Sequence, residues 1–193
     1  TWTHINIGTF SNVYVTSFFA NGNDIYAGVS TKGVYKSSDN GSTWTSSNSG
    51  ITATEFYSFT ANGNNLFVGT NTGIFTSTDN GSNWTAVNNG LPTNTSFTKL
   101  VSIGGNVLTG TNSTKIYSTS NNGLNWTLVS SLGYVLDFHP IGSKLFGAIG
   151  GAIYLSSDFG FSWVMVADTP QIQAGTTYAL ASDNNYLYAG SYR

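Results

Sequence analysis

Two acidic residues of this chain could supply the acid and base of a glycoside hydrolase. Glu55 and Asp137 lie on or beside runs that we predict to be innermost strands, and glycoside hydrolysis needs two carboxyl groups that face each other across a cleft. His139 follows Asp137 closely, and Lys99 lies on a corresponding run. We favour a simpler interpretation, in which these side chains are solvated polar groups that line a channel.

Other catalytic chemistries lack their usual residues. The chain has no cysteine, which excludes disulfides, thiolate catalysis and cysteine-ligated zinc. His4 and His139 are the only histidines, and no nucleophile-elbow motif surrounds a serine. Serine-hydrolase chemistry and a transition-metal site are therefore both disfavoured. We predict that the chain is not an enzyme and that it needs no metal and no cofactor.

Charge and hydropathy narrow the classes of partner. Only 7% of residues are charged, the formal net charge is −2 and 15% of residues are aromatic, which favours a folded chain over a disordered one. No apolar stretch approaches the length of a membrane span, and no signal peptide is visible. Nucleic acid is not expected as a partner, because the positive residues are scattered. They are Lys32, Lys36, Lys99, Lys115, Lys144 and Arg193.

A repeat of about forty residues organises the whole chain. Four tryptophans each close an eight-residue segment of the form Ser/Thr-x-Asp/Asn-x-Gly-x-x-Trp, which we call the box. Three of the four boxes have the acidic form Ser-x-Asp-x-Gly-x-x-Trp. The four boxes are Ser37–Trp44, Ser77–Trp84, Thr119–Trp126 and Ser156–Trp163. The fifth tryptophan, Trp2, precedes the first box by a similar distance. Spacing this regular predicts a repeat architecture.

Each box position has a mechanical role. The acid or amide can accept hydrogen bonds from N–H groups of a tight turn, the glycine permits a positive φ, and the tryptophan can bury its ring between sheets. One acidic residue per box is too few for a calcium site. We therefore interpret the box as structural. Its residues are Asp39, Asp79, Asn121 and Asp158, then Gly41, Gly81, Gly123 and Gly160, then Trp44, Trp84, Trp126 and Trp163.

Each repeat contains four short strand runs bounded by glycine and asparagine turns, and no segment has sustained helical periodicity. Four antiparallel strands per repeat are typical of a β-propeller blade. Alignment of the repeats puts one apolar column in the first strand, formed by Phe18, Phe59, Val101, Phe138 and Leu180. A second column at the start of the innermost strands holds Tyr14, Glu55, Phe97 and Tyr134.

Ring closure departs from this pattern. Residues 177–180 and 186–190 read as the first two strands of a fifth blade, and residues 2–6 read as its outermost strand. The third strand and its box are missing. Three explanations are open, of which the first two are that the chain is an excerpt of a longer array and that the fifth blade has only three strands. Alternatively, a neighbouring molecule donates a strand to the exposed edges, a route to self-association.

The boxes resemble the Asp-box, or BNR, repeat of bacterial sialidases, xyloglucanase-type glycosidases, sortilin-type receptors and photosystem II assembly factors. The resemblance covers essentially all of residues 1–193, which we treat as a single domain. It implies an all-β propeller of about five blades, the last incomplete and closed by both termini, with the boxes on the blade periphery. Sialidases of this family hold the substrate carboxylate with three arginines, whereas this chain has only Arg193.

Several residues are candidates for contact with a ligand or partner. Six lie on or near the innermost strands, and two form an aromatic pair in the fourth box: Tyr14, Glu55, Lys99, Tyr134, Asp137, His139, Phe159 and Phe161. The aromatic pair either packs on a neighbouring loop or contacts a partner. The loops 91–95 and 167–175 are further candidate surfaces.

We expect a non-catalytic binding or scaffold module that recognises a glycan or a protein and is secreted or on a bacterial cell surface. The alternatives are a fragment of a xyloglucanase-type hydrolase and an assembly factor of the photosystem II type.

Overall fold

A computed structural model describes residues 14–167, 177–183 and 186–191. All regular structure in these ranges is β-strand, and the strands form antiparallel sheets in sequential order. Four sheets have four strands and one has two. We call them blades I to V: β1–β4, β5–β8, β9–β12, β13–β16 and β17–β18. This confirms the predicted all-β fold and the incomplete last blade, whereas the proposed closing strand at residues 2–6 lies outside the described ranges.

The strand bounds are as follows. Blade I has β1 (Val15–Asn21), β2 (Asp24–Val29), β3 (Gly33–Ser37) and β4 (Thr45–Ser46). Blade II has β5 (Phe56–Asn62), β6 (Asn65–Thr70), β7 (Ile74–Ser77) and β8 (Thr85–Ala86). Blade III has β9 (Phe97–Ile103), β10 (Asn106–Thr111), β11 (Ile116–Thr119) and β12 (Thr127–Ser130). Blade IV has β13 (Val135–Ile141), β14 (Lys144–Ile149), β15 (Ala152–Ser156) and β16 (Val164–Ala167), and blade V has β17 (Thr177–Ser182) and β18 (Leu187–Ser191).

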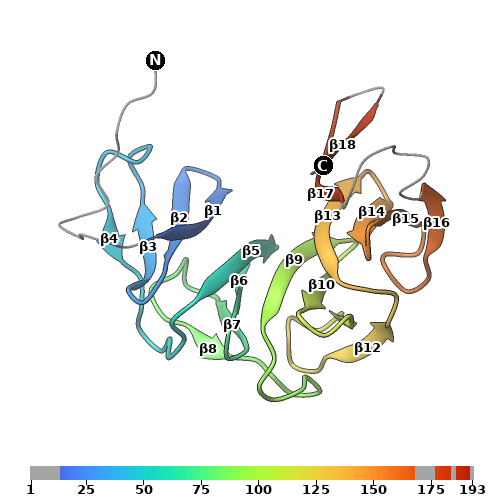
Figure 1. Cartoon of the computed structure of the whole chain (residues 1–193). Coiled ribbons are helices and arrows are strands. Elements are labelled where there is room, and N and C mark those ends of the chain that lie inside the picture. Colours follow the sequence, from blue (N-terminus) through green and yellow to red (C-terminus); the bar gives the residue numbers. More distant parts are fainter. Residues whose placement is uncertain (1–13, 168–176, 184–185, 192–193) are drawn as a thin grey trace.

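The blades follow one another along an arc, with blade I at one end and blade V at the other (Figure 1). The first strand of each blade is innermost, and β1, β5, β9, β13 and β17 contact one another in that order. Each innermost strand contains a bulge near its start, as at Val15–Ser17 and Phe56–Ser58. Bulges increase local twist, which suits a sheet that must splay outward from an axis.

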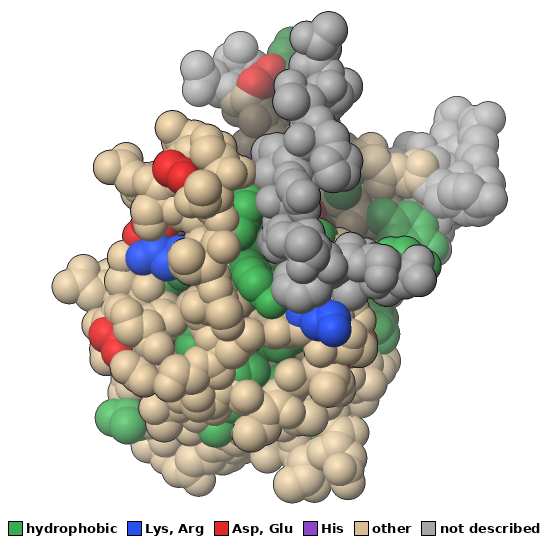
Figure 2. Space-filling model, turned by 90° about the vertical axis from the view of Figure 1, so that its left-hand side faces the viewer, with side chains coloured by type: hydrophobic (Ala, Val, Ile, Leu, Met, Phe, Trp, Pro, Cys, Tyr) green, Lys and Arg blue, Asp and Glu red, His purple; other side chains and the backbone are tan. Residues whose placement is uncertain are grey.

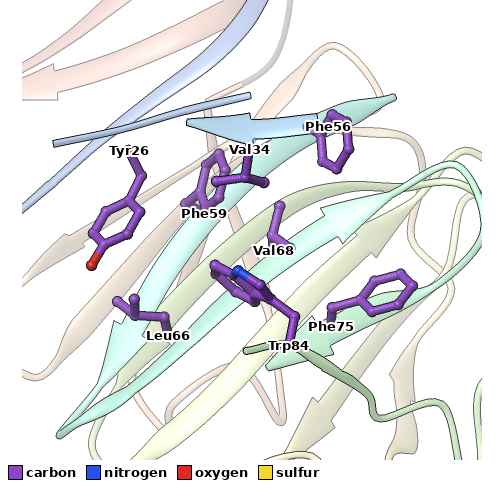
Figure 3. Packing of buried hydrophobic residues seen from close by; sticks show 8 residues of the cluster. All are labelled: Tyr26, Val34, Phe56, Phe59, Leu66, Val68, Phe75 and Trp84. Carbon is purple, nitrogen blue, oxygen red and sulfur yellow. The ribbon is translucent and has the colours of Figure 1, made fainter. Parts of the chain in front are cut away.

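The two faces of each blade pack against different neighbours. Face A carries the box tryptophan and packs on the preceding blade, while face B packs on the following blade. Figure 3 shows the interface between blades I and II, where Tyr26 and Val34 from face B of blade I meet Phe59, Leu66 and Trp84 from face A of blade II. These side chains are buried, so the hydrophobic core lies between the blades. A single sheet could not bury both of its faces alone.

The apolar column predicted for the first strands was wrong in blade III by one residue. Leu100 pairs with Thr109 next to Gly110, just as Phe59 pairs with Val68 next to Gly69. Leu100 therefore occupies the column, and it packs toward blade II, whereas Val101 packs toward blade IV. A shift of one residue moves a strand side chain to the other face. Both residues are apolar and buried, so hydrophobicity alone does not distinguish the two registers.

A glycine near the end of the second strand lets neighbouring blades approach closely. A Cβ added at Gly28 would lie 2.5 Å from Cβ of Phe56, and one added at Gly110 would lie 2.6 Å from Cβ of Val135. Phe56 and Val135 each start the innermost strand of the following blade. The glycine is therefore needed for backbone contact between blades, as a small residue at this position predicts.

Candidate functional site

The four boxes share one hydrogen-bonded geometry. In the first box, Oγ of Ser37 donates to Oδ1 of Asp39 over 2.8 Å, and the backbone N–H of Thr43 donates to the same oxygen over 2.8 Å. The Thr43 hydroxyl donates to Oδ2 over 2.6 Å. The second and fourth boxes repeat this pattern around Asp79 and Asp158. All three carboxylates are thus acceptors within their own turn.

These hydrogen bonds favour the charged form of each box carboxylate. The pKa of Asp39 is lowered to about 2, chiefly by the hydroxyl and backbone N–H of Thr43. The pKa of Asp79 is lowered to about 2 by the side-chain amide and backbone N–H of Asn83. The pKa of Asp158 is also lowered, chiefly by the Ser162 hydroxyl. A carboxylate held in this way is a poor proton donor near neutral pH.

The third box has an amide in place of the acid. Oδ1 of Asn121 accepts from the Thr119 hydroxyl at 2.8 Å and from the backbone N–H of Asn125 at 3.0 Å. Asn121 therefore keeps the two bonds that shape the turn without a negative charge. The box glycines Gly41, Gly81, Gly123 and Gly160 all have φ between 81° and 91°.

Boxes also fasten their blade to the preceding one. The backbone N–H of Trp84 donates to the carbonyl of Ser49 over 2.8 Å, and the indole Nε1 of Trp126 donates to the carbonyl of Val87 over 2.7 Å. Trp84 and Trp126 are buried, whereas Trp44 and Trp163 are half-buried and donate to the carbonyl of their own box glycine, Gly41 or Gly160.

The residues immediately before the innermost strands form what we call the inner rim: Tyr14, Glu55, Ser96 and Tyr134. Their backbone carbonyls accept equivalent hydrogen bonds from the turns between the second and third strands, at 2.9, 3.3, 3.0 and 2.9 Å. This corrects the predicted column, in which Phe97 was the third member. Phe97 is 1% exposed and packs in the core between blades II and III.

Along the inner rim, two aromatic side chains lie on either side of two polar ones. Tyr14 is 78% exposed and Tyr134 is 39% exposed. Between them along the chain, Glu55 is half-buried and its Oε1 accepts a 2.7 Å hydrogen bond from the hydroxyl of Ser30 in blade I. The inner rim therefore presents two aromatic rings, one carboxylate and one hydroxyl to its surroundings.

Lys99 and Asp137 occupy one position in successive innermost strands, and both bridge blades. Each is paired with the small residue of the second strand, Gly110 or Ala148. The Nζ of Lys99 lies 3.7 Å from Oδ1 of Asp137, and Oδ2 of Asp137 accepts a 2.8 Å hydrogen bond from the backbone N–H of Leu180. At the same position in blade II, Oγ of Ser58 accepts from the backbone N–H of Leu100 at 3.0 Å. The position therefore links neighbouring blades.

His139 has a similar location. Its Nε2 lies 2.8 Å from Oγ of Ser182, which belongs to the last strand pair. His139 and Asp137 thus both contact blade V, and among the described residues neither of them is hydrogen-bonded or ion-paired to Glu55. The alternative in which Glu55 and Asp137 act as acid and base has no support in these contacts.

The two phenylalanines of the fourth box have different environments. Phe159 is half-buried and packs against the core between blades III and IV, close to Gly104. It does so with φ of 59°, in the place where the other boxes have Asn40, Asn80 and Asn122 at similar values. Phe161 is 54% exposed. Of the two alternatives for this aromatic pair, Phe159 follows the first, because it packs on a neighbouring loop. Only Phe161 of the pair is available to a partner.

Sequence reasoning missed a polar cluster around Asp24. The carboxylate accepts from Nζ of Lys36 at 3.0 Å, from Nδ2 of Asn80 at 2.6 Å and from the Ser38 hydroxyl. The Ser38 hydrogen bond is the largest cause that lowers the pKa of Asp24. The contact between Asp24 and Ser38 could have been predicted from the hairpin, because the pairing of Ile25 with Ser37 places these two residues next to each other. Asn80 comes from blade II and could not be found this way.

Beside this cluster, at the hairpin tips of blades I and II, lies a polar pocket of about 410 Å³. It is at the end of the blades opposite the inner rim. Amide, hydroxyl and glycine residues line it together with one box carboxylate: Asn21, Gly22, Gly63, Asn64, Thr78, Asp79 and Asn80.

Charged side chains are sparse on the face drawn in Figure 2, where hydrophobic groups lie between polar ones. Among the described residues, no group of three or more His, Cys, Asp or Glu could hold a metal ion. In the same ranges no helix is long and apolar enough to cross a membrane.

Comparison with known proteins extends these observations. Residues 1–190 match the model of the DUF6242 beta propeller domain. A search of curated proteins finds no match. Among solved structures, an ancestral GH74 enzyme is similar with a TM-score of 0.78 and 20% identity, covering 97% of this chain and 28% of the other. The extracellular domain assigned to a one component system of B. thetaiotaomicron has a TM-score of 0.74 and 15% identity, covering 92% and 26%.

A third similar structure is YCF48 bound to D1 peptide, with a TM-score of 0.65 and 15% identity, covering 96% of this chain and 68% of the other. The chain thus spans little more than a quarter of the length of the first two structures. At these identities the similarity establishes the fold alone. The match of the family model over nearly all residues does more: this chain belongs to the DUF6242 beta propeller domain family.

Proposed function

We propose that this chain is a non-catalytic binding module of the Asp-box propeller type that recognises a glycan through the inner rim. The observation that carries the proposal is the exposure of Tyr14 and Tyr134 at equivalent rim positions on either side of Glu55 and Ser96. A tyrosine presents an apolar ring and a polar hydroxyl together. This combination suits a sugar, which has apolar C–H faces and hydroxyl edges.

The surroundings of the rim support an uncharged ligand. The chain has a formal net charge of −2, and the acidic side chain nearest the exposed tyrosines along the rim, Glu55, is engaged by Ser30. The box carboxylates are engaged within their own turns. The acids are thus used as hydrogen-bond acceptors, which supports binding over acid–base catalysis.

Location outside the cell is part of the proposal. It is supported by the similarity to an extracellular domain from B. thetaiotaomicron and by the Ser/Thr/Asn-rich, charge-poor composition. We propose a secreted or cell-surface protein of bacterial origin.

A xyloglucanase-type hydrolase is the second candidate, favoured by the similarity to GH74 enzymes. The hydrogen bond from Leu180 to Asp137 counts against it, because this carboxylate already links two blades. A peptide-binding assembly factor is the third, favoured by the similarity to YCF48 bound to D1 peptide.

One experiment separates these functions. The protein is applied to an array of plant and bacterial glycans, and the glycans that bind are then incubated with it and analysed for release of reducing ends. We expect binding without turnover, and an affinity loss of at least tenfold in Tyr14→Ala and in Tyr134→Ala. Phe161→Ala, which removes an exposed ring from a box instead of the rim, is the matched control and should bind normally.

The other outcomes each decide against the proposal. Turnover that is lost in Glu55→Gln would identify a hydrolase. A peptide-binding module would be identified if no glycan binds but a peptide does, and if Tyr14→Ala abolishes the binding of that peptide.

A further inference from the structure

A small pocket lies between the outer parts of blades III and IV, each of which has a neighbouring blade on both sides. The pocket has a volume of about 190 Å³. Residues in and beside the third box line it, together with Phe161 of the fourth box. Pockets for drug-sized ligands have volumes of roughly 300–1,000 Å³. This pocket therefore suits a smaller group, such as a single side chain.

Ser118 lines the pocket, and its hydroxyl has no hydrogen-bond partner among the described residues. The residue is only 5% exposed. On β11, Ser118 pairs with Leu108 of β10, so both side chains point to the same face of the sheet. This is face B, because a Cβ added at Gly160 of blade IV would clash with the side chain of Leu108. Ser118 therefore faces the box that carries Phe161.

The position of Ser118 is satisfied in the two preceding blades. In blade I the equivalent residue by strand pairing is Lys36, whose Nζ lies 3.0 Å from Oδ2 of Asp24. In blade II it is Thr76, whose hydroxyl donates to the carbonyl of Leu66 over 2.9 Å. A buried hydroxyl without a partner costs free energy, so a ligand that pairs with Ser118 gains from this difference.

Blade IV contributes an aromatic wall to the pocket. Phe161 is 54% exposed and directly follows the box glycine. The other boxes have Ser42, Ser82 and Leu124 at this place, so only the fourth box has an aromatic ring here. A half-exposed ring beside a pocket can stack on a second ring and shield it from water.

Several other polar groups of the lining are engaged within the box or by a neighbouring blade. The Thr119 hydroxyl donates to Oδ1 of Asn121 over 2.8 Å, and the same oxygen accepts from the backbone N–H of Asn125. Oδ1 of Asn125 accepts from Nδ2 of Asn89. None of the described lining residues is charged. These features favour a neutral ligand with a flat apolar body and one polar tip over a sugar, whose many hydroxyls would each need a partner.

We propose that this pocket binds a tyrosine side chain of an extended peptide. The phenol ring stacks on Phe161, and the phenol oxygen accepts a hydrogen bond from the Ser118 hydroxyl. Thr127 of β12 also lines the pocket, and β12 is the terminal strand of its sheet, on the outer side of the arc (Figure 1). The main chain of an extended peptide can add to such an edge. The pocket is separate from the glycan site proposed at the inner rim.

An NMR titration tests the side-chain site first. N-acetyl-tyrosinamide is added up to about 10 mM to ¹⁵N-labelled protein, since a single side chain binds with millimolar affinity at best. We expect shifts of backbone amides around Ser118 and Phe161. N-acetyl-phenylalaninamide lacks the hydroxyl and should bind about fivefold more weakly, because it leaves Ser118 unpaired.

Two variants assign the roles of the lining residues. Ser118→Ala should abolish the preference for the tyrosine derivative and still bind the phenylalanine derivative, a result that mere loss of structure would not give. Phe161→Ala should weaken the binding of both compounds about tenfold, because the aromatic wall is lost. Leu124→Ala changes the equivalent place of the third box, outside the pocket lining, and is the matched control. The spectrum of each variant without ligand reports whether it is folded.

A second titration tests the peptide. A pentapeptide with one central tyrosine between threonines should bind about fivefold more tightly than N-acetyl-tyrosinamide, because its main chain can pair with β12. Equal affinities of these two compounds would overturn the peptide as the ligand.

The other outcomes decide against the pocket itself. The proposal is wrong if N-acetyl-tyrosinamide causes no shifts around Ser118 and Phe161, or if the preference for tyrosine survives in Ser118→Ala. Methyl glucoside is titrated in parallel. Shifts that it alone causes, and that Phe161→Ala removes, would identify a sugar site in place of a tyrosine site.

Discussion

The Oδ2 atom of Asp137 accepts a 2.8 Å hydrogen bond from the backbone N–H of Leu180, which lies in the next blade. The same carboxylate has Nζ of Lys99, from the preceding blade, 3.7 Å from Oδ1. Three consecutive blades are thus joined through one side chain. A residue that is attractive as a catalytic acid in the sequence serves as a link between strands.

Removal of this link should lower stability. Asp137→Ala leaves the N–H of Leu180 without its acceptor, and we expect the free energy of unfolding to fall by about 1–2 kcal/mol. Asp137→Asn keeps one oxygen and should cost less. Urea unfolding measures both, with the exposed Lys144→Ala on the adjacent strand as control. Equal stability of Asp137→Ala and the wild type would contradict the assigned role.

Acid should weaken the boxes. The pKa of Asp79 is about 2 in the folded chain, whereas the ordinary value of 3.8 applies in the unfolded chain. The unfolded state therefore binds the proton more readily. This contribution to stability is present above pH 3.8 and is lost as the pH falls toward 2. In Asp79→Asn, which copies Asn121, that part of the pH dependence should disappear.

The measurement is the thermal midpoint of both proteins between pH 7 and pH 2. We expect the wild type to be the more stable at neutral pH and the gap to narrow on acidification. A gap that stays constant across this range would show that the charge of Asp79 contributes nothing.

The box tryptophans should differ in their effect. Trp84 is 3% exposed in the core between blades I and II, and Trp84→Ala should cost about 3–5 kcal/mol of unfolding free energy. Trp44 is only half-buried, so Trp44→Ala should cost clearly less. Denaturant unfolding at a concentration where the chain is monomeric provides the comparison. Equal losses would argue against the packing of Trp84 between two blades.

Equivalent glycines should respond differently to the same substitution. A Cβ at Gly69 would lie less than 3.0 Å from the backbone oxygen of Phe97, which cannot move independently of its strand. Gly69→Ala should therefore cost about 1–3 kcal/mol. Gly190→Ala has open space and should change the stability of the monomer by less than about 0.5 kcal/mol. Thermal unfolding of dilute protein measures both, and equal effects would be inconsistent with the blade spacing.

The sequence alone determined the repeat and the strand type, and it predicted a structural role for the boxes. These features follow from local chemistry: short β-branched and aromatic runs between glycine turns form hairpins, and an acid with a glycine two residues later closes a turn around itself. In the structure, Asp39 and Asp79 each accept hydrogen bonds from within their own turn.

Only the tertiary structure decided which side chains remain free. Asp137 and Asp24 receive partners from other blades. Phe18 and Phe59 share one repeat position yet differ in exposure, because within the described part of the chain only Phe59 packs on a preceding blade. The assignment of Leu100 instead of Val101 to the common column also needed the strand register, since both residues are apolar. Local patterns specify each blade, whereas the partners of a side chain depend on the neighbour against which that blade is stacked.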